Sequence, residues 1–554
     1  MNFERLPNEI LLDIFNYFPV VDLFQSFGDL NSRLSLLIVE RLKSLSLDFH
    51  SVSRQNFNRI CSMFLRSIVS HVHHIRLSNG DGSPKQIEDF LNAGFTWDQF
   101  SQLKTISICD LCSESILSKM VRDLLNLSML TNLTIAGSYV RFTDRSYGDF
   151  IDRIWKLPSL KIFYLNSYSD LTQFIPPTIS STTIESVSIW GYDLTVVHFV
   201  SLLSATPRLK KISISLRADQ SIDEIVRFPM MKRFQMISEN CSEEFLRQIL
   251  QMMPNLESLS LNLSETCVDG DQWKRLIRQY LPQLNRLKFL MSSNMADEQI
   301  IRSVLDSFQQ AFWSKEHQWD VQCFIDRMNL IPTAYFMLSS LRIDFLSWTN
   351  STEIFLDSIK NSPILCPTIR CLQLEIKISD GDRPIPVYLE LNYVTHLIIT
   401  IDQGIELSTT LLQSFCVMPR LRLLTIFSSS AIVSLQLLSS LSYNSAIRQL
   451  CLETRNQSFD IEHCTTLLQS PIVAQLQTLH INIRTRQSLT ILHANLCHLS
   501  VLKIRCQDDP FEHEIQTDLS NIDDKFISWC QENLPNVYSI SRDPVFPNDV
   551  QIVY

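Results

Sequence analysis

The sequence predicts an α/β solenoid, in which strand–helix units stack to form one parallel sheet with helices on its other side. Three features predict this fold: a short apolar pattern recurs along nearly the whole chain, proline often precedes it, and helical patterns fill the intervals. A single unit of this kind cannot bury its apolar side chains, but stacked units share a continuous core. The length of 554 residues would otherwise suggest roughly three or four separate domains.

The recurring pattern has apolar residues at positions i, i+3 and i+5. Side chains alternate along a strand, so i+3 and i+5 point to one face, and i+2, i+4 and i+6 point to the other. Neighbouring copies begin 22 to 31 residues apart, with one interval of 54 between Leu284 and Leu338. The copies begin at Leu42, Val72, Leu103, Leu130, Leu160, Ile184, Leu209, Met231, Leu256, Leu284, Leu338, Ile369, Val394, Leu421, Ile447, Leu476 and Leu499.

Between the copies the sequence has apolar residues at helical spacing. Ile116, Met120 and Leu124 lie on one side of a helix, as do Phe245 and Ile249. Proline ends a helix and is tolerated at the start of a strand. It stands two residues before several copies, at Pro158, Pro207, Pro229, Pro254, Pro282, Pro367 and Pro419.

This L-x-x-L-x-L core resembles that of leucine-rich repeats. The resemblance implies a parallel sheet on a concave face and helices on a convex face. Regular repeats of this family carry Asn or Cys eight residues after the first leucine. Here these positions hold other residues, among them Leu111, Ser138, Tyr168, Tyr192, Arg217 and Glu239. We therefore expect an irregular leucine-rich-repeat solenoid with variable turns.

Residues 1–42 have a different pattern, which predicts three short helices. The first lies between Pro7 and Pro19, the second opens near Asp22, and the third includes Leu34, Leu37 and further apolar residues. A module of this size has a small core. We therefore expect much of its apolar surface to need a partner.

The module resembles the F-box, the motif by which substrate receptors join a cullin–RING ubiquitin ligase. The resemblance rests on Leu6-Pro7-x-Glu9-Ile10-Leu11-x-x-Ile14-Phe15-x-x-Phe18, on Asp22-Leu23, and on Leu30-Asn31-Ser32-Arg33. The family usually has Trp directly after this arginine, where this sequence has Leu34. The resemblance implies a Skp-family linker protein and a cullin scaffold as partners. It assigns linker binding to Leu6, Pro7, Ile10, Leu11, Ile14, Phe15, Phe18 and Leu23.

The expected organisation is an F-box-like helical module over 1–42, a transition with the first degenerate repeats over 43–102, the solenoid over 103–540, and a C-terminal tail or cap over 541–554. An irregular insert is expected at about 293–337, within the long interval between copies. It contains Trp313 and Trp319, which we expect to pack over the sheet.

A solenoid of this kind binds partners on the strand face that points away from the helices. Exposed aromatic and arginine side chains there are the types that dominate binding energies, and a basic face suits an acidic or phosphorylated peptide. The alternative is a solvated sheet face rich in Ser and Thr. The predicted client-binding residues are Tyr164, Trp190, Lys211, Arg233, Arg286, Lys288 and Arg342.

Composition argues against several other classes of protein. Only 10 glycines are present, and none forms a phosphate-binding loop. The net charge of -10 argues against nucleic acid as a partner. The chain lacks the long apolar stretch of a membrane span, and its start does not resemble a signal peptide. We therefore expect a protein of the cytoplasm, the nucleus or both, with its 14 cysteines as free thiols.

No catalytic residues, metal ligands or cofactor are predicted. Cys109 and Cys112 form a lone C-x-x-C without the second pair that a zinc site of this type needs. His493, Cys497 and His498 have ligand-like spacing, but the sequence provides no evident fourth ligand. Both sets are interpreted as structural residues.

Together these features predict a non-catalytic substrate-recognition adaptor of an SCF-type ubiquitin ligase. One alternative is a stand-alone interaction scaffold whose N-terminal helices only cap the solenoid. Another is an inhibitor or sensor of the horseshoe type, which uses the strand face alone. Binding of a Skp-family linker separates the first interpretation from the other two.

Overall fold

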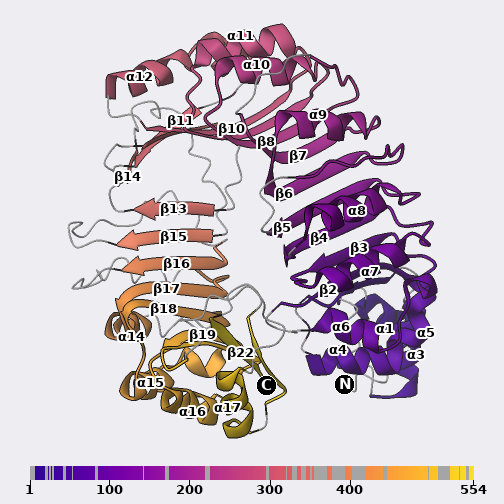
Figure 1. The fold of residues 1–554 in the computed structure, drawn as a ribbon, viewed down its shortest axis with the longest axis vertical. Coiled ribbons are helices and arrows are strands. Elements are labelled where there is room, and N and C mark those ends of the chain that lie inside the picture. Colours follow the sequence, from indigo (N-terminus) through magenta and orange to yellow (C-terminus); the bar gives the residue numbers. More distant parts are fainter. Residues whose placement is uncertain are drawn as a thin grey trace. The chain divides into compact units, whose positions relative to one another are not determined.

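The chain divides into two compact units, Met1–Leu287 and Lys288–Tyr554 (Figure 1). The computed structural model describes residues 6–15, 17–18, 23, 26–27, 30–41, 45–50, 52, 54–80, 85–140, 142–168, 174–218, 225–294, 298–317, 319, 321–326, 333–338, 345–349, 352–354, 371–376, 394–401, 418–440, 446–496, 498–509, 524–535, 537–543 and 548–554.

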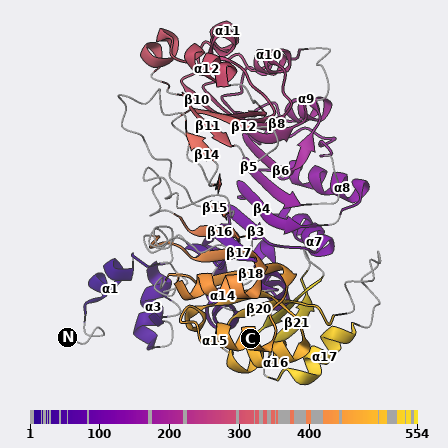
Figure 2. The same ribbon diagram turned by 90° about the vertical axis from the view of Figure 1, so that its left-hand side faces the viewer.

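The first unit begins with a helical pair, α1 (Asn8–Phe15) and α3 (Ser32–Arg41), which Figure 2 shows near the N-terminus. Asn31 caps α3, because its side chain accepts a hydrogen bond from Leu34 N at 2.9 Å. Such a cap satisfies one of the backbone donors that the first turn leaves unpaired. These helices and the described residues between them are called the N-terminal module below.

The sheet of the first unit is parallel, and its strands β1 to β9 follow one another in chain order. These strands are β1 (Leu45–Asp48), β2 (Val72–Ser78), β3 (Thr105–Cys109), β4 (Asn132–Tyr139), β5 (Ile162–Tyr168), β6 (Ser186–Leu194), β7 (Lys211–Leu216), β8 (Arg233–Glu239) and β9 (Ser258–Ser264).

Helices connect most of these strands and lie on one side of the sheet (Figure 1). Several begin with a side chain that caps the first turn: Ser113, Thr143, Thr195, Ser242 and Asp269. The helices are α4 (Arg54–Ile60), a π-helical turn (Cys61–Leu65), α5 (Arg66–Ile68), a 3-10 turn (Val69–His71), α6 (Gln86–Asn92), a 3-10 turn (Trp97–Gln99), α7 (Glu114–Leu124), α8 (Asp144–Trp155), α9 (Val196–Ser204), α10 (Glu243–Gln251) and α11 (Gly270–Tyr280).

The core of this unit contains two rows of buried strand side chains that cross the sheet in register, with buried side chains of the helices beside them. The i+3 row is Ile75, Ile106, Leu133, Phe163, Val187, Ile212, Phe234 and Leu259. The i+5 row is Leu77, Ile108, Ile135, Leu165, Ile189, Ile214, Met236 and Leu261. The predicted α/β repeat architecture is therefore confirmed, with each pattern in the register that the shared core requires.

Serine hydroxyls bond between repeats one position before the place where regular repeats have asparagine. Ser167 Oγ donates to Ser138 O at 2.8 Å, and Ser238 Oγ donates to Leu216 O at 2.5 Å. Both serines are buried at the ends of their strands. Because a hydroxyl has one hydrogen and an amide has two, each serine donates a single bond in the turn.

The second unit starts with antiparallel pairing. Strand β12 pairs with β10, whose first two residues belong to the first unit, and also with β11, which pairs with β14. Leu338 was expected to lead from a turn into a parallel repeat strand, but it is the last residue of the antiparallel β12. Leu341 and Ile343 of that copy lie outside the described residues. The elements are β10 (Arg286–Asn294), α12 (Glu298–Ser307), a π-helical turn (Phe312–Glu316), β11 (Val321–Asp326), β12 (Thr333–Leu338) and β14 (Thr352–Ile354).

The tryptophans of the expected insert belong to an aromatic cluster that follows α12. Trp313 is fully buried, with ring centroids 4.8 Å from Phe308 and 5.1 Å from Phe312. The ring of Trp319 stacks on that of His317, with the ring centroids 4.2 Å apart. Ring packing of this kind adds stability beyond the area that it buries.

The rest of the second unit is again a parallel sheet, in the order β13-β15-β16-β17-β18-β19-β20, closed by the antiparallel strands β22 and β21. Strand β22 therefore places the last residues of the chain against the last parallel strand. The strands are β13 (Phe345–Thr349), β15 (Cys371–Ile376), β16 (His396–Ile401), β17 (Leu423–Ser430), β18 (Gln449–Gln457), β19 (Thr478–Ile483), β20 (Val501–Cys506), β21 (Ser539–Arg542) and β22 (Asp549–Val553). The helices are α14 (Ala431–Ser440), α15 (Ile461–Leu468), a 3-10 turn (Val473–Gln475), α16 (Arg486–Asn495) and α17 (Lys525–Asn533).

Candidate functional site

The N-terminal module has several large apolar side chains on its surface. Single exposed apolar residues are common in proteins, but a concentration of them in one small module indicates an interaction surface. The exposed residues are Ile10, Tyr17, Phe18, Leu30 and Leu36.

The residues predicted to bind a linker divide into a surface set and a core set. Pro7, Ile10 and Phe18 are exposed, and Leu6 and Ile14 are half-buried. The core set is fully buried: Leu11, Phe15 and Leu23. In this structure the core set supports the module, and the surface set is available for contact.

Arg33 of α3 forms hydrogen bonds with the start of α1. Its Nη2 donates to Leu6 O at 2.6 Å, and its Nε donates to Asn8 Oδ1 at 2.9 Å. Leu34, which occupies the place of the family's usual Trp, is fully buried. The segment that carries Pro7 and Ile10 is therefore held by hydrogen bonds as well as by apolar packing.

Three of the predicted client-binding residues form a basic row across the first unit. Lys211 on β7 lies in register with Arg233 on β8, and Arg233 lies in register with Ser258 on β9. Arg286 continues the row, because its backbone N–H bonds to Glu257 O as Ser258 N–H bonds to Lys232 O. The three basic side chains are exposed. Like charges at paired positions repel, so an acidic ligand would stabilise this row.

The two predicted aromatic residues lie on neighbouring strands, away from the basic row. Tyr164 on β5 is in register with Ser188, and Trp190 stands two positions further along β6, in register with Asn166. Both aromatic side chains are half-buried, and such diagonal neighbours lie within reach of aromatic rings. Lys288 lies on β10 within the second unit, and Arg342 lies outside the described residues.

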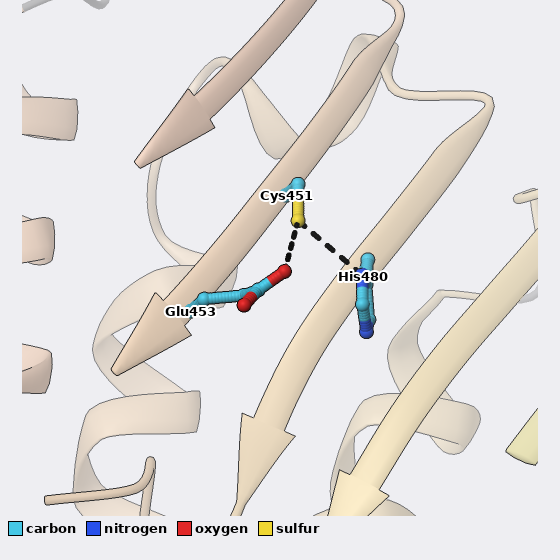
Figure 3. A group of neighbouring side chains, drawn as sticks. All are labelled: Cys451, Glu453 and His480. Atoms are coloured by element: carbon cyan, nitrogen blue, oxygen red, sulfur yellow. Dashed lines mark hydrogen bonds between the residues drawn. The ribbon is translucent and has the colours of Figure 1, made fainter. Parts of the chain in front are cut away.

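The second unit contains a cluster of ionisable side chains, shown in Figure 3: Cys451 and Glu453 on β18 and His480 on β19. Cys451 is in register with His480, and its Sγ lies 3.3 Å from His480 Nδ1. The same Sγ lies 3.6 Å from Glu453 Oε1. All three side chains are half-buried. We call these residues the Cys451 cluster.

A second layer of charged residues surrounds the Cys451 cluster. His480 Nε2 lies 3.1 Å from Asp549 Oδ2 on β22, and Asp549 is 1% exposed. Arg505 Nε lies 2.7 Å from the other oxygen of Asp549. Lys503, in register with His480, pairs with Asp543 at 3.0 Å. Each of these two basic residues therefore has its own acidic partner beside the cluster.

The cysteine of this cluster is not activated as a nucleophile. Burial raises the pKa of the Cys451 thiol, and the nearby carboxylate of Glu453 raises it further. Reactive cysteines have a lowered pKa instead, because the thiolate is the attacking species. The Cys–His–Asp sequence of contacts therefore does not have the electrostatics of a cysteine hydrolase.

The Cys451 cluster was not predicted from the sequence, although the repeat pattern contains the signal for it. In the copies beginning at Ile447 and Leu476, the i+4 positions are Cys451 and His480, and the first copy has Glu453 at i+6. Alignment of neighbouring copies by their outward positions would have placed the three residues together. Linear spacing alone does not, because the three residues come from two different repeats.

The ligand-like sets that sequence analysis did consider have other contacts. Cys109 is buried and Cys112 is half-buried. His493 Nδ1 lies 3.2 Å from Tyr554 Oη, and His498 Nε2 lies 3.1 Å from Val473 O. Cys497 lies outside the described residues.

Comparison with known proteins yields structural likenesses alone: no protein-family model and no curated protein matches the sequence. A crystal structure of a TLR13–ssRNA13 complex has 11% identity and a TM-score of 0.26, over 70% of this chain and 67% of that chain. An internalin from Listeria monocytogenes has 14% identity and a TM-score of 0.24, over 80% and 92%. At these TM-scores neither likeness bears on the function of this chain.

The fold follows from the chain's own repeats. Their L-x-x-L-x-L positions form continuous buried rows in a parallel sheet that helices cover on one side. The chain has a leucine-rich-repeat fold. In the described part of this repeat protein, no helix has the length and apolar character needed to cross a bilayer.

Proposed function

We propose that this chain is a non-catalytic adaptor of an SCF-type ubiquitin ligase. The N-terminal module binds a Skp-family linker, the linker joins it to a cullin scaffold, and the repeats bind a client protein. The observation that carries the proposal is the exposure of Pro7, Ile10 and Phe18 on a module whose sequence resembles the F-box. The chain would act in the cytoplasm or the nucleus.

The division of the module into a surface set and a core set supports this role. Ile10 is 45% exposed, so a linker that covers it would remove apolar surface from water. The buried Leu11, Phe15 and Leu23 keep α1 in place and contribute to linker binding through that position. Leu34 fills the core where the family usually has Trp.

The basic row supports a client with an acidic or phosphorylated segment. Lys211, Arg233 and Arg286 stand in the same row of the sheet, so an extended acidic strand crossing the sheet would meet them in turn. Tyr164 and Trp190 provide aromatic surface on β5 and β6, the two strands that precede β7. Lys288 and Arg342 complete the predicted client-binding set.

The test is co-purification of the full chain with a Skp-family linker and a cullin. Pro7→Ala combined with Ile10→Ala should weaken linker binding about tenfold or more. Each aliphatic carbon removed from a buried contact lowers the binding free energy by about 0.8 kcal/mol. Ile10→Ala alone removes three such carbons, and about half of the Ile10 surface is exposed and can contact the linker. Binding is measured by titration of the linker, and circular dichroism confirms folding.

Val197→Ala is the matched control, because Val197 is 63% exposed on α9 in the same unit. This variant should bind the linker as the unaltered chain does. If the intact folded chain captures no linker, the proposal is wrong. If the double variant retains full affinity, the assigned surface is wrong.

The second candidate is a stand-alone interaction scaffold whose N-terminal helices only cap the repeats. The complete burial of Leu11, Phe15, Leu23 and Leu34 favours it, since a cap needs an apolar interior and no partner. In that case Pro7→Ala with Ile10→Ala would leave every binding partner unchanged.

A further inference from the structure

The chemistry of the Cys451 cluster is that of a transition-metal site. It brings together a thiol, an imidazole and a carboxylate, with one ligand atom from each lying within 4.8 Å of the others. Thiolate and imidazole ligands together select zinc over magnesium or calcium, which prefer oxygen ligands alone. We propose that Cys451, Glu453 and His480 bind one Zn²⁺ ion, a role that goes beyond the adaptor function.

The two distances from the sulfur of Cys451 fit tetrahedral coordination. Zinc bonds of about 2.3 Å to sulfur and about 2.0–2.2 Å to nitrogen and oxygen, at tetrahedral angles, place sulfur about 3.5 Å from each of the other ligand atoms. The observed separations from Cys451 Sγ are 3.3 Å to His480 Nδ1 and 3.6 Å to Glu453 Oε1. Both separations from sulfur are therefore within a few tenths of an ångström of the tetrahedral value, and the remaining pair of ligand atoms lies within 4.8 Å.

Asp549 supplies the outer contact that zinc-binding histidines usually have. Its Oδ2 lies 3.1 Å from His480 Nε2, on the side of the ring opposite Cys451. Neither of these two buried atoms has a hydrogen-bond partner within the described part of the chain. A hydrogen on Nε2 directed at Oδ2 would satisfy both atoms and leave the lone pair of Nδ1 for the metal. Arg505 holds Asp549 from the other side, at 2.7 Å. This contact is independent of the ligand distances and points to the same ligand.

The charges of the site balance those of the ion. When zinc binds, the thiol of Cys451 releases its proton to water, and the resulting thiolate and the Glu453 carboxylate carry two negative charges. The surrounding charges are paired: Asp549 with Arg505, and Lys503 with Asp543. The thiolate and carboxylate therefore neutralise Zn²⁺.

Three protein ligands leave the fourth tetrahedral position for water. Structural zinc sites use four protein ligands, whereas sites with three keep an exchangeable position. Among the residues that the structure describes, the side chains that could bind the ion here are Cys451, Glu453 and His480. Their partial exposure on the sheet face lets solvent reach the ion.

The test is titration of the full chain with Zn²⁺ after chelator treatment, by calorimetry, and with Co²⁺, by visible and near-ultraviolet absorption. We expect one equivalent of each ion per chain and a sulfur-to-cobalt charge-transfer band. Cys451→Ser should abolish the band and the zinc equivalent, and His480→Gln should weaken binding. Asp549→Asn should lower zinc affinity about 10–100-fold.

Cys112→Ser is the matched control, because Cys112 is another half-buried cysteine and belongs to the first unit. It should leave the titration unchanged. Glu453→Gln keeps the size of the side chain and serves if Cys451→Ser fails to fold; it should weaken zinc binding. An intact chain without a saturable equivalent, or a folded Cys451→Ser that binds zinc as the intact chain does, overturns the proposal.

Discussion

Replacement of Phe163 by alanine tests whether one shared core holds the repeats of the first unit. Phe163 is fully buried on β5, in register with Leu133 and Val187 on the strands at either side. Its ring meets Trp155 of α8 edge to face at 5.7 Å. Truncation of a buried phenylalanine costs about 3–5 kcal/mol, because lost burial and the remaining cavity add. We expect Phe163→Ala to lower the free energy of unfolding by about 4 kcal/mol, since the aromatic pair with Trp155 is also lost.

Urea unfolding measures the cost, and native-state hydrogen exchange locates it. Repeats contact mainly their neighbours, so protection should fall most in β4, β5 and β6 and should persist in β16 to β20 of the second unit. Ile162→Ala is the control, because Ile162 lies next to Phe163 on the same strand but is 43% exposed. Equal costs for the two variants, or equal loss of protection in both units, would refute the shared-core argument.

Two further perturbations test local features. Gly191→Ala should lower the free energy of unfolding by about 1–3 kcal/mol, because Gly191 has φ of 87° and an added Cβ would lie 2.1 Å from Ser167 O. An unchanged thermal melt would contradict this. Acid should destabilise the second unit near α17. Burial raises the pKa of Asp524, but hydrogen bonds from Arg542 and from backbone N–H groups outweigh it, and the pKa is lowered overall. A lowered folded pKa stabilises the fold above the unfolded value, and this stability is lost as the pH falls through the folded pKa. Thermal melts at decreasing pH should show a smaller loss for Asp524→Asn; equal acid sensitivity contradicts the assignment.

The parallel core could be predicted because one burial rule applies to the copies whose side chains the structure describes. Leu133, Phe163 and Val187 differ in size and shape, yet each stands at i+3 of its copy and each is buried in the same row. Alternation along a strand fixes which side chains face the helices, and the interval between copies fixes which strands are neighbours. These two facts are local in sequence, so the fold of the first unit follows from them.

Strand direction could not be predicted in the same way. Leu338 satisfies the apolar pattern, but it ends β12, which runs antiparallel to β10 and β11. Alternation has the same period in parallel and antiparallel strands, and only the connection between strands distinguishes them. The long interval before Leu338 was the one sign that the regular connection is interrupted.

The sequence also does not show which of the predicted linker-binding residues are exposed and which are buried. Ile10 and Leu11 are adjacent apolar residues, and both match the F-box pattern, yet one is exposed and the other is fully buried. This difference in exposure depends on where α3 packs against α1. Arg33 of α3 helps to fix that packing through its hydrogen bonds to Leu6 O and Asn8. A pattern of apolar residues does not determine which of them meets a neighbour inside the chain and which meets solvent.

The outward positions of a repeat are free to vary because the core does not depend on them, and this freedom explains where the candidate sites occur. In the first unit they hold Lys211 and Arg233 in one row, and in the second unit Cys451 and His480 occupy one row as register partners. Parallel register converts residues from separate repeats into neighbours about 4.8 Å apart along the sheet. A binding site on this fold can therefore arise from single substitutions in adjacent repeats, without any change in the buried rows that maintain the solenoid.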